Sequence, residues 1–344
     1  MEKQRIMYLD MAKGIGIILV VVGHSTLASD QVITWLASFH MPLFFIISGM
    51  LIWQIGEEKK PFLLSIKRKA KSIMIPFLTF NIIYLIINCL NLIRMPDLIT
   101  PSQIWDAAYQ AITLYGISVL WFLPALFVSQ ITFLALRKIP KGRDIVTVIS
   151  VLLLGAIAVS GKPLVEQLPI VGLRYFCSML LRSSAAFVFV TVGYYTKKYV
   201  LKEREQPSLM ELLLGIGCCG LVVYLSFITP SVDMNFLVFG NPLTYYSIAI
   251  IGTMGVVLIC KNIKTIGTLT FLGENSLVIM ATHMDCQILT LSFLFASIAN
   301  NISPFAKVYV YYGTFVVVLV TMELITIYIF NHYLYFLIGR KRPN

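Results

Sequence analysis

Charged side chains are scarce in this sequence of 344 residues. They make up 12% of the chain, whereas 58% is hydrophobic, and the mean hydropathy is +0.85. A soluble domain carries about 25% charged residues because its surface must face water. The composition therefore excludes an ordinary soluble protein and predicts an outer surface that lies mostly in lipid. The length leaves no room for a large soluble domain beside the membrane part, so we expect one domain over residues 1–344.

The sequence also lacks the cysteine patterns of disulfide frameworks and zinc sites. Its six cysteines are scattered and no C-x-x-C pair occurs, so we expect neither disulfides nor a bound metal ion. No internal repeat, low-complexity tract or flexible linker is evident. Acidic residues are few, with 16 Asp and Glu against 27 Lys and Arg, which gives a net charge of +11.

Apolar stretches of about the length that crosses roughly 30 Å of hydrocarbon recur along the chain. They predict an all-α integral membrane bundle of about ten transmembrane helices, at 11–29, 34–55, 73–93, 117–136, 145–160, 178–196, 209–228, 243–260, 271–298 and 306–330. The segment 61–72 alternates apolar and basic residues at helical spacing, which predicts an amphipathic helix on the cytoplasmic surface. The segment from Pro163 to Arg182 mixes apolar residues with two arginines, so we expect part of it to lie in the outer interface or to line a cavity.

The basic residues are unevenly divided between the two sides of this topology. All of the 27 Lys and Arg residues fall on one side except Arg94, Lys162, Arg174, Arg182 and Lys307. Such an excess marks the cytoplasmic side, so we predict a multi-pass protein of the plasma (inner) membrane with both termini in the cytoplasm. Because the charges follow the topology, we expect no nucleic-acid partner.

Three ionisable side chains lie in or near the first predicted helix. Polar groups in a membrane span are costly and mark a partner or a function. Asp10 and Lys13 are three residues apart, which allows an ion pair on one helix face. Lys13 and His24 are eleven residues apart, so they project from nearly one face, about 16 Å apart along the axis. Two interpretations stay open: a shared functional face, or an interfacial ion pair with a histidine that bonds a neighbouring helix.

The second predicted helix opens with an interruption. His40 precedes Pro42, whose ring breaks the helical hydrogen-bond ladder and frees a backbone carbonyl. Ser48 and Gly49 form a patch of small residues, which suits ordinary helix packing or the close approach of a ligand.

The ninth predicted helix carries Glu274, Asn275 and His283. The first two fall near its cytoplasmic boundary, where polar residues are common, and His283 is deeper. The topology puts His24, His40 and His283 at similar depth in the central to outer part of the membrane. We therefore expect these three histidines to share a cavity.

Five runs of residues resemble membrane acyltransferase family 3. The first is the run from Tyr8 to His24, in which a basic residue, here Lys13, and ten further residues precede the histidine. The others are FHMPLFFIISG (39–49), KRKAKSIMIPF (67–77), LWFLPALF (120–127) and LGENSLVIMATH (272–283), in the family's order. The resemblance covers nearly the whole chain and is closest to the branch that O-acetylates sugars. The family often has Arg where this chain has Lys13, which keeps the charge but loses the bidentate fork.

The resemblance implies an acetyl-CoA-dependent O-acetyltransferase. The donor would be cytoplasmic acetyl-CoA, and the acceptor a hydroxyl of a cell-surface sugar or polysaccharide, or of its lipid-linked precursor. His24 would be the general base or a transient acyl carrier, because a neutral imidazole suits both tasks near neutral pH. The other expected residues are Lys13, Asp10 and His283 in catalysis, and His40, Ser48, Trp121, Glu274 and Asn275 on the acceptor side or around the reacting groups.

A basic surface on the predicted cytoplasmic side suits the phosphates of coenzyme A. It consists of Lys67, Arg68, Lys69 and Lys71. Plain positive-inside topology and contact with membrane lipid explain the same cluster, so both interpretations stay open. We also expect that any extracytoplasmic partner is a separate protein, since no fused extracellular hydrolase-like domain is evident.

Two other functions are weighed against the enzyme. Intramembrane His, Lys and Glu residues with a proline-interrupted helix are also features of secondary transporters. The absence of inverted repeats and of paired broken helices speaks against a transporter. A domain that binds without catalysis is disfavoured by the retained spacing between Lys13 and His24.

Overall fold

The computed structural model describes residues 6–24, 29–94, 100–204, 206–284 and 312–341. These residues form helices and no β-strand, apart from one isolated antiparallel bridge between Asp233 and Val238. The α-helices are α1 (Met7–His24), α2 (Asp30–Ala37), α3 (His40–Gln54), α4 (Phe62–Lys69), α5 (Ile75–Arg94), α6 (Pro101–Ile112), α7 (Phe122–Leu136), α8 (Arg143–Ser160), α9 (Lys162–Glu166), α10 (Val171–Tyr199), α11 (Leu209–Ser226), α12 (Pro242–Asn262), α13 (Gly267–Glu274), α14 (Ser276–Thr282) and α17 (Tyr312–His332). Short turns are η1 (Glu57–Lys59), the π-helical η2 (Ala70–Met74), η3 (Ser118–Trp121) and η6 (Tyr335–Ile338).

Eight helical segments of the described residues are long and apolar enough to cross a membrane. They are Met7–His24, Asp30–Gln54, Phe62–Ile93, Ser118–Leu136, Arg143–Ser160, Val171–Tyr199, Leu209–Ser226 and Pro242–Asn262. Each coincides with one of the first eight predicted stretches, so the prediction of a helical membrane bundle is confirmed. The ninth and tenth predicted stretches are described only in part, because residues 285–298 and 306–311 lie outside the described residues. Within the tenth stretch, α17 contains a shorter apolar helix, Val316–His332.

Three boundaries differ from those predicted. The basic segment 61–72 is not a separate helix, because α4, η2 and α5 join into one helical stretch of 32 residues. The sixth span begins at Val171, so Arg174 and Arg182 both lie within α10. The described part of the ninth span is two short helices, α13 and α14, which meet at Asn275.

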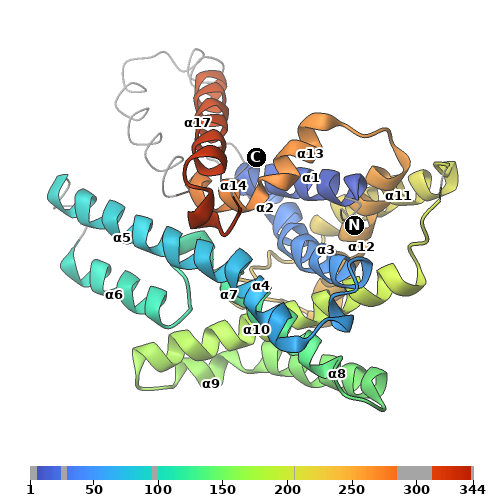
Figure 1. Cartoon of the computed structure of the whole chain (residues 1–344), viewed down its shortest axis with the longest axis horizontal. Helices are drawn as coiled ribbons and strands as arrows, with labels where there is room; N and C mark the ends of the chain where they lie inside the picture. Colours follow the sequence, from blue (N-terminus) through green and yellow to red (C-terminus); the bar gives the residue numbers. More distant parts are fainter. Residues whose placement is uncertain (1–5, 25–28, 95–99, 205, 285–311, 342–344) are drawn as a thin grey trace.

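The helices pack around α3 and α10, which make the most extensive helix–helix contact among the described residues. A Cβ built at Gly49 would lie 1.9 Å from the carbonyl oxygen of Val190, and one at Gly193 would lie 1.9 Å from that of Ile46. Glycine at both positions therefore lets the two backbones touch, as small residues do between membrane helices. Figure 1 shows α8 and α9 beside α10 along the lower edge, α5 with α6 at the left, and α17 at the top.

A second glycine crossing holds α1 against α13. A Cβ at Gly14 would lie 2.0 Å from the Leu269 oxygen, and one at Gly273 would lie 1.8 Å from the Asp10 oxygen. The turn that carries Asp10 and Lys13 is thus fixed on the backbone of α13.

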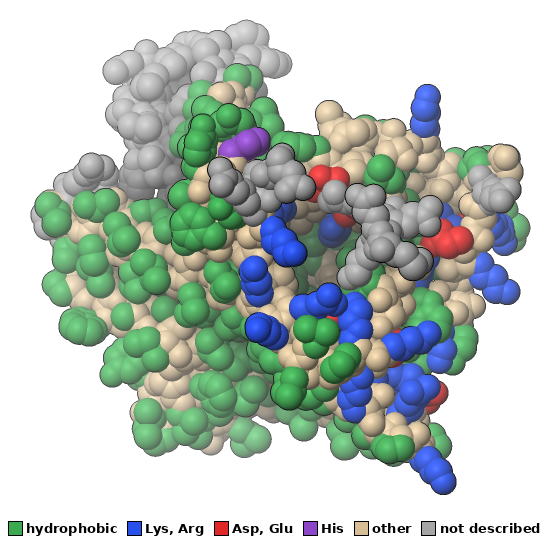
Figure 2. All heavy atoms as spheres, in the orientation of Figure 1, with side chains coloured by type: hydrophobic (Ala, Val, Ile, Leu, Met, Phe, Trp, Pro, Cys, Tyr) green, Lys and Arg blue, Asp and Glu red, His purple; other side chains and the backbone are tan. Residues whose placement is uncertain are grey.

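The outward faces of the bundle are apolar. Ile145 and Leu152 of α8 are 68% and 69% exposed, and α11 presents Leu213 and Ile216 in the same way. Such a surface is stable in lipid and not in water. Figure 2 shows hydrophobic side chains covering one side of the displayed face and Lys and Arg side chains gathered on the other.

Candidate active site

The last turn of α1 and the end of α14 bring two histidines together. His24 Nδ1 lies 3.2 Å from His283 Nε2, and the ring centroids are 5.1 Å apart. His283 is fully buried. The two residues are 259 positions apart in the chain, so the pair exists only because α1 packs on α14.

Backbone carbonyls define the tautomers of this pair. His283 Nδ1 lies 2.8 Å from the Ile279 oxygen. A carbonyl oxygen only accepts, so we assign the proton to this Nδ1, and Nε2 of the neutral ring is an acceptor. His24 Nδ1 therefore donates toward His283 Nε2 and toward the Val20 oxygen, which is 2.9 Å away. In neutral His24 the basic nitrogen is then Nε2.

His24 and His40 line one cavity of about 410 Å³, the histidine cavity. Its size falls within the range of small-molecule sites. His40 opens α3 because the chain breaks at Ser38 and Phe39, just before Pro42, and its Nδ1 lies 2.5 Å from the Leu36 oxygen. Further residues of this cavity are Ser118, Trp121, Asp233 and Asn235. The prediction that three histidines share a cavity therefore holds for His24 and His40, whereas buried His283 contacts His24 and is not among the lining residues. The catalytic roles of all three stay predictions.

Lys13 lies in a second, smaller cavity. Its Nζ is 2.6 Å from Asp10 Oδ1, so the expected ion pair is present, and Asp10 is buried. The lysine cavity, of about 180 Å³, is lined by Lys13, Val20 and Ser48 among mostly apolar residues. Met41 lines both cavities. Together they follow one face of α1 from Lys13 to His24, which are about 16 Å apart along a continuous helix.

The structure separates the two residues of the small patch on α3, Ser48 and Gly49. Gly49 packs on the backbone of α10, whereas Ser48 lines the lysine cavity and donates to the Phe45 oxygen at 2.7 Å. Ser48 therefore lies beside Lys13 rather than in the histidine cavity.

Glu274 and Asn275 have partners in the C-terminal segment. Asn275 Oδ1 accepts from Asn331 Nδ2 at 2.9 Å and from Arg340 at 3.1 Å, and Arg340 also donates to the Glu274 carbonyl at 2.6 Å. These bonds account for the break between α13 and α14. The residues that line the histidine cavity do not include Glu274 or Asn275.

The predicted donor-binding lysines lie on α4 and η2. Lys67 and Lys71 are exposed, and so is Arg68, while Lys69 is half-buried. Buried Glu57 anchors the start of this segment through Lys60 and through Ser65 Oγ, which donates to Glu57 at 3.1 Å.

The charge state of Glu57 follows from these contacts. Burial opposes its ionisation, but the hydrogen bonds of Lys60 and Ser65, with the charges of Lys60 and Lys69, outweigh burial and hold the pKa of this carboxyl below its usual value. Part of the charge of Lys69 is therefore matched within the protein. Lys67, Arg68 and Lys71 remain the solvent-facing cations of the segment.

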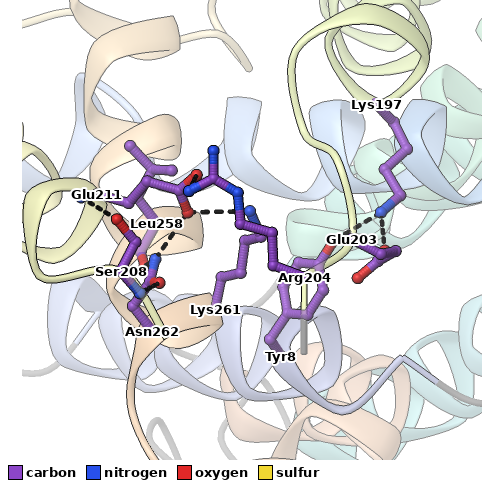
Figure 3. A network of polar contacts seen from close by, with 9 residues as sticks. All are labelled: Tyr8, Lys197, Glu203, Arg204, Ser208, Glu211, Leu258, Lys261 and Asn262. Carbon is purple, nitrogen blue, oxygen red and sulfur yellow. Dashed lines mark hydrogen bonds and ion pairs between the residues drawn. The ribbon is translucent and has the colours of Figure 1, made fainter. Parts of the chain in front are cut away.

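A polar network fixes the beginning of α1 at the same end of the bundle as Lys13 (Figure 3). Lys197 pairs with Glu203 and donates to the Tyr8 hydroxyl at 2.8 Å. A second group joins Glu211 to Lys261 at 2.9 Å, with Arg204, Ser208 and Asn262 around it. Because Glu203 and Glu211 match these lysines, the network ties the α10–α11 connection to α1 and α12.

Sequence reasoning missed several polar residues near the histidines. Asp233 and Asn235 belong to a short loop that no sequence motif marks. For Arg182 the sequence predicted only that its segment lies partly in the outer interface or lines a cavity. Glu323 of α17 is buried, and the Thr282 hydroxyl lies 3.2 Å from its Oε2. A carboxylate in an apolar helix was the available signal for Glu323. Among the described residues, no three His, Cys, Asp or Glu side chains are grouped as a metal site requires.

These features define a polytopic helical membrane protein in which one helix carries half-buried Lys13, paired with buried Asp10, and half-buried His24, paired with buried His283. A family model described as an acyltransferase domain matches residues 6–327. The chain therefore belongs to membrane acyltransferase family 3 and is a membrane acyltransferase. No curated protein and no solved structure is detectably similar to it.

Proposed function

We propose that the protein transfers an acetyl group from cytoplasmic acetyl-CoA to a hydroxyl of a cell-surface sugar or polysaccharide, or of its lipid-linked precursor. The observation that carries this proposal is the hydrogen-bonded pair of His24 and His283. It orients a basic Nε2 on a ring that lines a cavity large enough for a small acceptor.

The chemical step follows from the tautomers. The acceptor oxygen attacks the thioester carbonyl carbon while its proton passes to His24 Nε2. The carbon–sulfur bond then breaks, the thiolate of CoA takes that proton, and an O-acetyl ester remains. His283 stabilises the transient imidazolium because its Nε2 accepts from His24 Nδ1 at 3.2 Å. In the alternative, His24 Nε2 itself attacks the thioester carbonyl carbon and the thiolate of CoA leaves; the acceptor hydroxyl then attacks the acetylated imidazole, the nitrogen–acetyl bond breaks, and the hydroxyl proton neutralises the thiolate.

The donor reaches this base along α1. Lys13 lies about 16 Å from His24 along the helix axis, which suits an elongated donor such as a pantetheine thioester. The apolar lysine cavity would hold that arm, and the exposed cations of α4 and η2 would meet the phosphates. Both termini lie in the cytoplasm in this proposal, so the basic end faces the donor and the histidine cavity opens toward the outer half of the plasma membrane. A separate extracytoplasmic protein would deliver or receive the sugar.

The test compares His24→Ala with His332→Ala in purified protein. His332 is an exposed histidine at the far end of α17, so its loss controls for the removal of an imidazole. We expect His24→Ala to abolish ester formation from acetyl-CoA, with unchanged folding by size-exclusion chromatography, and His332→Ala to retain it. Ester formation by a folded His24→Ala protein refutes the assignment. Substrate uptake into vesicles without any ester would instead identify a transporter.

A further inference from the structure

The loop between α11 and α12 is folded against the histidine cavity. Asp233 and Val238 exchange two backbone hydrogen bonds, of 2.7 and 2.8 Å. Asp233 Oδ1 accepts from the backbone N–H groups of Asn235 and Phe236, at 2.7 and 3.1 Å. This 233–238 loop is therefore locally fixed, and four of its residues, Asp233 to Phe236, line the cavity.

Arg182 ties this loop to the segment that precedes α7, which contains Tyr115 and Trp121. The side chain is fully buried in α10; its Nε donates to the Asn235 carbonyl at 2.7 Å, and another nitrogen donates to the Tyr115 carbonyl at 3.1 Å. The guanidinium lies 3.8 Å from the Tyr115 ring centroid and 5.6 Å from that of Trp121. One cation thus sets the positions of both Asn235 and Trp121.

The Asn235 side chain carries an unused acceptor. Its Oδ1 is buried and has no hydrogen-bond partner within the described part of the chain. A buried acceptor without a donor is costly, and structures retain one where a ligand supplies the donor. Asn235 and His24 line the same cavity, so such a ligand would lie beside the proposed base.

We propose that the 233–238 loop forms the acceptor subsite and recognises the hydroxyl groups of a neutral sugar ring. Asn235 Oδ1 accepts from one ring hydroxyl, and the apolar face of the ring lies against Trp121. Hydroxyl groups of the same ring can also donate to the carboxylate of Asp233, which lines the cavity. This inference rests on the proposed acetyl transfer and adds the residues that select the acceptor.

The experiment compares Asn235→Ala with Asn235→Asp and Asn241→Ala in the full-length protein. Asn241 is exposed and caps α12 by accepting from Thr244 N, so it controls for a change in the same connection outside the cavity. The probe is the polysaccharide fraction of source cells that lack the gene, and base-released acetate is measured after incubation with acetyl-CoA. Calorimetry with acetyl-CoA alone reads the donor side separately.

We expect Asn235→Ala to raise the polysaccharide concentration at half-maximal rate more than tenfold and to leave the acetyl-CoA Kd within twofold. Asn235→Asp keeps an acceptor oxygen and should recover most of this loss, and Asn241→Ala should resemble the wild type. Unchanged half-saturation in Asn235→Ala, or an equal loss in Asn241→Ala, overturns the subsite and leaves the proposed function intact. A wild-type protein that neither binds acetyl-CoA nor forms an ester overturns both.

Discussion

The hydrogen bond between His24 and His283 can be removed with little change in shape by the substitution His283→Phe. Phenylalanine fills a similar volume in a fully buried position but offers no acceptor to His24 Nδ1. His24 would keep its bond to the Val20 oxygen, so the ring would remain in place while the transient imidazolium lost its partner.

The size of the effect follows from the charge that develops during transfer. A hydrogen bond to a charged group contributes about 1.5–3 kcal/mol, against about 0.5–1.5 kcal/mol for a neutral one. Because kcat depends only on the amount by which the bond strengthens in the transition state, about 1–1.5 kcal/mol, its loss should lower kcat by about fivefold to tenfold, at about 1.4 kcal/mol per factor of ten. The KM for acetyl-CoA should stay unchanged, since the proposed donor site lies elsewhere along α1.

The assay follows release of the CoA thiol at saturating acceptor, with thermal unfolding as the check on folding. The variant His283→Gln retains a side-chain oxygen that can accept, so we expect a smaller loss than with phenylalanine. A folded His283→Phe protein with kcat within twofold of the wild type would show that the pair is structural. Loss as complete as in His24→Ala would contradict this magnitude and show that His24 cannot act at all without its partner.

Two further substitutions test the bundle and the donor surface. Gly193→Ala should destabilise the protein by about 1–3 kcal/mol in thermal unfolding, because its Cβ would lie 1.9 Å from the Ile46 oxygen. The control Gly217→Ala should not, because no atom lies within 4 Å of the added Cβ. Equal stability of the two variants would contradict the close crossing of α3 and α10. Lys67→Ala with Lys71→Ala should raise the calorimetric Kd for acetyl-CoA about fivefold to thirtyfold, since each exposed charge contact is worth about 0.5–1 kcal/mol. The Lys-to-Arg double variant should bind normally, and unchanged binding by the alanine variant would assign these residues to membrane lipid.

Local patterns in the sequence were sufficient to predict the first eight spans and the ion pair of Lys13 with Asp10. A membrane helix is a run of apolar residues, and an i, i+3 pair depends only on helical geometry. The helix break before His40 was also predictable, because Pro42 cannot continue a preceding helix. Each of these features is set by residues within one helical segment.

The remaining features depend on residues far apart in the chain. The break at Asn275 is stabilised by Asn331 and Arg340, which are 56 and 65 positions away. Nothing near Asn275 in the sequence indicates those partners. The bond of Arg182 to the Asn235 carbonyl likewise joins positions 53 apart, through a loop that no pattern marks. Such contacts follow from tertiary packing, so the structure was needed to assign them.

In the proposed reaction, donor and acceptor meet where the lysine cavity adjoins the histidine cavity. Met41 lines the lysine cavity and the histidine cavity, and it follows His40 at the start of α3. On the proposed route, a thioester that enters beside Lys13 would pass this side chain to reach His24. Methionine is unbranched and adapts to irregular space, so it can separate the cavities when they are empty and yield to a narrow pantetheine arm. The same arrangement would let the acetyl group cross much of the bundle without an open pore for ions or water.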